Sequence, residues 1–137
     1  MFSKKAKSTA LVLLNNAVRQ QMSGHAMDRL KALAKQPDFT QTNAYQGFCV
    51  DLCKDVLLQV RKQMALQSPS HARTLEKLVA HPETLYHESI LEKQGVYTFP
   101  LLFGLLFFSL THRTPALEDL QVVQQYFDKF LYELATE

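Results

Sequence analysis

The sequence is poor in glycine and cysteine and has little net charge. Only four glycines occur in 137 residues, and Leu, Ala, Gln, Lys and Glu outnumber Val, Ile and Thr, which favours helix over strand. Two cysteines form at most one pair, so a secreted domain built on disulfides is excluded, and a reducing cytoplasm fits best. The formal net charge is only +2 and the basic residues are spread out, so charge alone indicates no polyanionic partner.

Sequence motifs of common catalytic chemistry are also lacking. The chain has no G-x-S-x-G elbow, no glycine-rich phosphate loop and no H-E-x-x-H pair. The neighbouring acids Glu118 and Asp119 fall at a predicted helix start, where the helix dipole already accounts for them. We therefore lean against an enzyme, although acid–base sites assembled from distant residues leave that question open.

Candidate metal ligands occur in pairs rather than in sets of four. Cys49 and Cys53 are four residues apart in a predicted helix, a spacing that supplies two zinc ligands at most and does not reach disulfide geometry. Glu83 and His87 have the same spacing, beside His81 and without a second pair of ligands. We expect the thiols to pack as small hydrophobic groups, and we expect no metal and no cofactor.

Helical periodicity is what the sequence contains in abundance. Its 47% hydrophobic and 20% charged residues are typical of a globular protein, and apolar positions recur at helical spacing almost throughout. The pattern predicts one compact all-α domain, residues 1–137, of about six to seven helices. These are expected at about 3–22, 25–35 and 42–67, from about 70, at about 82–94 and 97–111, and from 114 onward.

Turn and cap residues support several of these boundaries. Gly24 is expected to end the first helix, since glycine accepts the left-handed cap conformation. Thr42 and Thr114 are expected N-caps, and Thr98 before Pro100 is typical of a further helix start.

Residues 98–109 form an uncharged apolar run within the central predicted helix, about 97–111. At about 1.5 Å per residue, the run from 97 to 110 spans roughly 21 Å, against about 30 Å for a bilayer core. We therefore expect a buried central helix of the bundle rather than a membrane span. A glycine inside it either lets a neighbour approach closely or opens space for a small apolar ligand or lipid. The residues that would line such a ligand site are Phe99, Phe103, Gly104 and Phe107.

The leading functional hypothesis is protein–protein interaction, as an adaptor or regulator. Four aromatic residues on the last helix cannot all point to one core, and those left outside would anchor a partner, either another protein or a second copy in a homodimer. These candidate interface residues are Tyr126, Phe127, Phe130 and Tyr132.

Two further hypotheses concern nucleic acid and membranes. Residues 30–48 have the outline of a helix-turn-helix, with Thr40, Gln41, Asn43 and Gln46 as candidate base-reading residues. The turn carries proline instead of glycine and flanking lysines are few, so DNA binding stays an alternative and not the expected partner. The basic start of the first helix, with Lys4, Lys5 and Lys7, would allow contact with an anionic membrane surface, and it lacks the features of a signal peptide.

Overall fold

The structure is a computed structural model that describes the backbone of residues 4–137 and the side chains of residues 9–137. Over this range the chain is 80% helical and contains no strand, which confirms the predicted all-α bundle. Its seven α-helices in chain order are α1 (Lys4–Gln21), α2 (Gly24–Leu33), α3 (Asn43–Gln67), α4 (Pro69–Ala80), α5 (Glu88–Leu91), α6 (Phe99–Thr111) and α7 (Leu117–Thr136). Two short 3-10 turns, η1 (Phe39–Gln41) and η2 (Pro82–Thr84), precede α3 and α5.

Capping side chains fix where helices α3 and α6 begin. The Thr42 hydroxyl accepts a hydrogen bond from the Tyr45 N–H at 3.2 Å, and the Thr98 hydroxyl accepts one from the Leu101 N–H at 3.3 Å. Each bond satisfies one of the N–H groups that a helix start leaves without an intrahelical partner. Gly24, which follows α1, has a φ of +52°, the positive value expected of a glycine at that break.

Two predicted boundaries were wrong because core packing decides them. Residues 82–94 form the turn η2 and the single-turn helix α5 instead of one helix. Tyr86, between them, is only 6% exposed, and the extended backbone of His87 then starts α5. The last helix begins at Leu117 with Ala116 as its N-cap, not at Thr114, because Pro115 is buried against α6.

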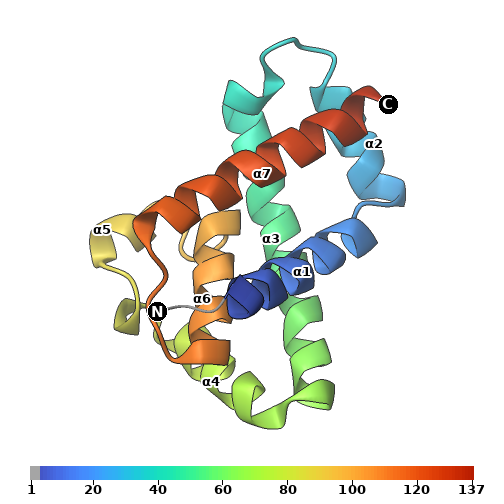
Figure 1. Cartoon of the computed structure of the whole chain (residues 1–137). Helices are drawn as coiled ribbons and strands as arrows, with labels where there is room; N and C mark the ends of the chain where they lie inside the picture. The colour runs from blue at the N-terminus through green and yellow to red at the C-terminus, as the bar shows by residue number, and fades with distance from the viewer. Residues whose placement is uncertain (1–3) are drawn as a thin grey trace.

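Helix α6 occupies the middle of the bundle (Figure 1), as predicted for the apolar run. It contacts α1, α4 and α7, and α3 passes beside it. The Ser109 hydroxyl, fully buried on this helix, donates to the Leu105 carbonyl at 2.7 Å and so needs no other partner. Among residues 4–137, no helix combines the length and the apolarity that crossing a membrane requires.

Helices α1 and α7 both lie on the near side of the bundle in Figure 1. Their side chains meet at two places. The Tyr126 hydroxyl donates to Asn15 Oδ1 at 3.3 Å, and the Arg19 guanidinium lies 4.6 Å from the centre of the Phe130 ring. These contacts join the first and last helices of the chain across the surface of the core.

Candidate functional site

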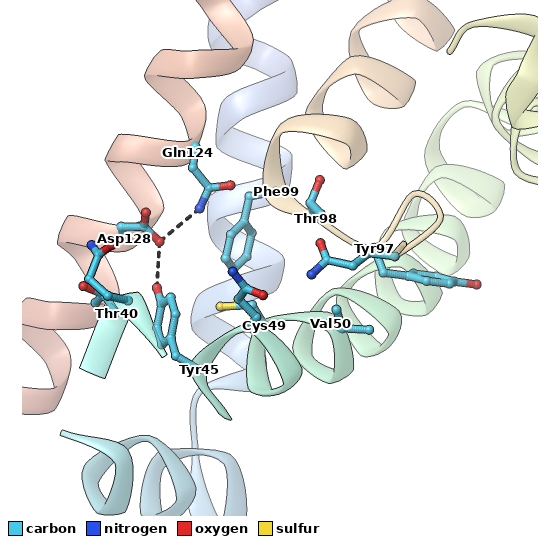
Figure 2. Close-up of a pocket in the computed structure, with 12 residues that line it drawn as sticks. Thr40, Tyr45, Cys49, Val50, Tyr97, Thr98, Phe99, Gln124 and Asp128 are labelled. Atoms are coloured by element: carbon cyan, nitrogen blue, oxygen red, sulfur yellow. Dashed lines mark hydrogen bonds between the residues drawn. The ribbon is translucent and has the colours of Figure 1, made fainter. Parts of the chain in front are cut away.

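A cavity of about 250 Å³ lies where the first half of α3 faces α7 and the start of α6 (Figure 2). The turn η1 and the residues just before α6 complete its walls. Most of the lining side chains are polar, although the surrounding core is apolar. The lining residues are Thr40, Gln41, Tyr45, Gln46, Cys49, Val50, Gln94, Tyr97, Thr98, Phe99, Gln124 and Asp128.

A hydrogen-bonded network of three side chains forms one end of this cavity. Figure 2 shows Tyr45 from α3 pointing at Asp128 from α7, and the Tyr45 hydroxyl donates to Asp128 Oδ1 at 2.8 Å. The Gln124 side-chain amide, one turn earlier on α7, donates to the same oxygen at 3.0 Å. Bonds to a carboxylate are stronger than those between neutral groups, so the network holds the carboxylate in a fixed position.

Aromatic rings of the core pack against this network and hold it in place. The Phe39 ring meets the Tyr45 ring edge-on at 5.6 Å and stacks on the Tyr132 ring at 5.7 Å. On the other wall, the Phe99 ring stacks on the Phe127 ring at 4.5 Å. Both lining rings are almost fully buried, Tyr45 at 3% exposure and Phe99 at 1%, so these two parts of the cavity wall belong to the packed core.

The protonation states of the two titratable groups beside Asp128 follow from burial. Burial, with the adjacent Cys49 and Asp128 as further causes, raises the pKa of Tyr45 well above its ordinary value. Burial likewise raises the pKa of the Cys49 thiol to about 12. Both groups therefore stay protonated at neutral pH. Tyr45 acts as a hydrogen-bond donor to Asp128, and neither group supplies the thiolate or phenolate that nucleophilic chemistry needs.

The residues predicted to line an apolar ligand site are divided between two places. Phe99 lines the cavity, whereas Phe103, Gly104 and Phe107 are buried farther along α6. A side chain at Gly104 would collide with the Tyr86 hydroxyl, which donates to the Leu101 carbonyl at 2.9 Å. The space left by this glycine is therefore filled by Tyr86, so Gly104 serves the close approach of a neighbouring segment.

The four predicted interface residues differ in exposure. Tyr126 is 38% exposed and Tyr132 is 48% exposed, whereas Phe127 is fully buried and Phe130 is half-buried beneath Arg19. The structure therefore leaves only the two tyrosines with much ring surface outside the core.

The candidate metal and redox residues do not come together as a site. Within the part of the chain that the structure describes, no group of three or more possible ligands is arranged to hold a metal ion. Cys49 and Cys53 are free thiols, the second fully buried. Glu83 lies in η2 and pairs with the exposed His81 at 3.1 Å, whereas His87 caps α5, so Glu83 and His87 share no helix.

The residues of the nucleic-acid and membrane hypotheses are placed only in part. Thr40, Gln41 and Gln46 line the cavity, and Asn43 is exposed at the start of α3. Lys4, Lys5 and Lys7 lie in the first turns of α1, and their side chains fall outside the described residues.

Asp128 and Gln124 were not predicted as site residues. Their four-residue spacing on the polar side of the last helix is the only signal in the sequence, and it is typical of ordinary surface positions. Their partner Tyr45 lies 83 residues away along the chain, so the fold alone brings the network together.

Comparisons of this chain with models of known protein families, with curated proteins and with solved structures found no match.

Proposed function

We propose that the protein binds a small polar molecule in the cavity between α3, α6 and α7, without changing it chemically. The observation that carries this proposal is the Tyr45–Asp128–Gln124 network at the cavity wall. Polar groups cost free energy to hold in a partly buried position, and a few of them in a concave, rigid site typically fix the orientation of a ligand.

Binding is favoured over catalysis by the state of the reactive groups. Cys49 and Tyr45 are held protonated, and among the described residues no histidine, lysine or second carboxylate lines the cavity. General acid–base or nucleophilic catalysis needs a group poised near neutral pH or activated by a neighbour. The free thiols are in keeping with the cytoplasm, which we include in this proposal.

A fragment screen by two-dimensional NMR tests the proposal, with cavity filling as the perturbation. We expect bound fragments to shift the side-chain amide resonances of Gln94 and Gln124, which line the cavity. Val50→Phe places a ring in the cavity and should abolish these shifts. Leu58→Phe is the matched control, because Leu58 lies on the same helix and is 54% exposed.

Two outcomes would contradict the proposal. One is a screen in which no fragment shifts the lining resonances of the wild-type protein. The other is binding that survives Val50→Phe unchanged in a variant with a wild-type circular dichroism spectrum.

Protein–protein interaction is the second candidate function, and one surface favours it. Val12 on α1 is 54% exposed, and Val122 and Tyr126 on α7 are 62% and 38% exposed. The Asn15–Tyr126 hydrogen bond places these helices next to each other, so the exposed apolar groups flank one junction. Exposed aromatic and aliphatic groups at such a junction are typical of association surfaces.

Sedimentation velocity over a range of protein concentrations tests this second candidate for the simplest partner, a second copy. A homodimer through the α1–α7 junction predicts a faster-sedimenting species that Val122→Glu removes. Leu66→Glu is the control, since Leu66 is 86% exposed on α3. A wild-type protein that stays monomeric, or equal effects of both substitutions, would exclude a homodimer through this surface.

A further inference from the structure

We infer that the ligand of the α3–α6–α7 cavity is a small amine that carries one positive charge, held by Asp128. This inference rests on the proposed binding function and names the chemical class of its ligand. Among the described residues that line the cavity, Asp128 is the only charged one. A ligand with one positive charge would therefore complete the charge balance of the site, whereas an anionic ligand would meet like charge.

The hydrogen bonds of Asp128 leave one of its oxygens for such a ligand. Tyr45 and Gln124 both donate to Oδ1. Among the described residues, none donates to Oδ2. A carboxylate can accept about four hydrogen bonds in total, so the ligand nitrogen can donate to a remaining acceptor position of Asp128 while the two bonds from Tyr45 and Gln124 stay intact. The two donors on Oδ1 also keep the carboxylate from rotating away.

The basic side chains near the cavity do not supply the missing positive charge. The positive charge of the Arg29 guanidinium acts on Cys49, whose pKa it lowers slightly against the effect of burial. This guanidinium pairs with Asp51 at 2.8 Å and lies 5.4 Å from the centre of the Phe48 ring. The Lys54 ammonium lies 5.3 Å from the Tyr97 ring centre, and Figure 2 shows that ring directed away from the cavity. Neither Arg29 nor Lys54 is a lining residue, so the charge of Asp128 is available to a ligand.

The remaining walls suit an organic ammonium group better than a metal ion. Tyr45, Val50 and Phe99 add apolar surface to the lining, which suits a ligand with an apolar body. The four glutamines and two threonines supply neutral acceptors for the remaining N–H groups. A calcium ion would need about six to eight oxygen ligands, and Asp128 is the only carboxylate among the described lining residues.

The size of the cavity restricts the ligand further. Pockets for drug-sized molecules measure about 300–1,000 Å³, and this one, at about 250 Å³, falls just below that range. A single ring or a short chain with one amine fills it. A nucleotide or a large lipid does not fit inside.

Three probe molecules of nearly equal size and different charge test the inference on the wild-type protein. Benzylamine is cationic at neutral pH, benzyl alcohol is neutral and benzoate is anionic. We expect benzylamine to shift the Gln94 and Gln124 side-chain amide resonances, with an affinity about tenfold or more above that of benzyl alcohol. Benzoate should bind most weakly.

Asp128→Asn tests the role of the carboxylate itself. The asparagine oxygen can still accept from Tyr45 and Gln124, so the network keeps its shape while the charge is removed. We expect this variant to lose the preference for benzylamine and to bind benzyl alcohol as the wild type does. Glu133→Gln is the control, because Glu133 is an exposed acid on the same helix.

The outcomes separate the inference from the proposed function. Equal affinities for benzylamine and benzyl alcohol, or tighter binding of benzoate, would overturn the amine assignment and leave small-molecule binding in place. Binding of benzylamine that is unaffected by Asp128→Asn would also overturn it. No shift at the lining residues with any of the three probes would overturn the amine assignment, and the fragment screen would then decide separately on the proposed function.

Discussion

Gly104→Ala is the substitution that tests the packing of this bundle most directly. In an exposed helix, replacing glycine by alanine stabilises by about 1 kcal/mol, because glycine has the larger backbone entropy in the unfolded chain. At position 104 the added methyl group would collide with the Tyr86 hydroxyl. It would also lie 3.0 Å from the Tyr86 Cζ and 3.3 Å from the Pro115 Cγ. Tyr86 must therefore move.

The expected magnitude is the sum of opposing effects. Overpacking a core costs about 1–3 kcal/mol. Displacing the Tyr86 hydroxyl also breaks its buried hydrogen bond to Leu101, and an unsatisfied buried group costs about 1–3 kcal/mol. After subtracting the gain of about 1 kcal/mol in helix propensity, we expect Gly104→Ala to lower the free energy of unfolding by about 1–5 kcal/mol, with a central value of about 3 kcal/mol.

A double-mutant cycle with Tyr86→Phe identifies the cause. Tyr86→Phe alone should cost about 1 kcal/mol, because it removes one hydrogen bond from a buried ring. In that background the colliding atom is absent, so Gly104→Ala should cost much less, with a coupling of about 1 kcal/mol or more.

Urea unfolding followed by circular dichroism measures all four proteins, with the slope m checked for constancy. A Gly104→Ala protein that is more stable than the wild type would contradict this prediction, because it would show that helix propensity alone governs the position. A coupling near zero would also refute it, because the loss would then arise away from Tyr86.

Three further predictions concern a cap, a thiol and a surface ion pair. Thr98→Ala should lower the free energy of unfolding by about 1 kcal/mol, because it removes the N-cap bond to the Leu101 N–H. Thr98→Ser keeps the hydroxyl that accepts this bond, so it should cost much less than Thr98→Ala. For Cys49, a folded-state pKa raised from 9.0 to about 12 means that its contribution to stability is complete below about pH 9 and is lost as the pH rises towards 12. Between about pH 8 and about pH 10.5, the urea midpoint should therefore fall more for the wild type than for Cys49→Ala. An equal fall in the two proteins would contradict the burial of this thiol. The Arg61–Glu76 pair, at 2.9 Å and with Glu76 57% exposed, should contribute less than about 1 kcal/mol, so Glu76→Gln should leave the urea midpoint nearly unchanged.

Local signals were strong enough to predict the helices that have clear ends. The cap at Thr42 and the start of α6 after Thr98 follow from short-range hydrogen bonds that each segment makes within itself. The central position of α6 was predictable as well, because a helix that is apolar on every face is buried by its neighbours. These features depend on residues at most a few positions apart.

Helical periodicity therefore sufficed to predict an all-α bundle with an apolar central helix, whereas the cavity between α3, α6 and α7 arises only from tertiary packing. Tyr45 and Asp128 meet because α7 packs over the start of α3 and α6, and no local pattern encodes contact across 83 residues. The same holds for Tyr86, which enters the space at Gly104 and breaks the helix expected over residues 82–94. In each case the free energy gained by burying side chains from distant segments outweighs the local preference of the chain.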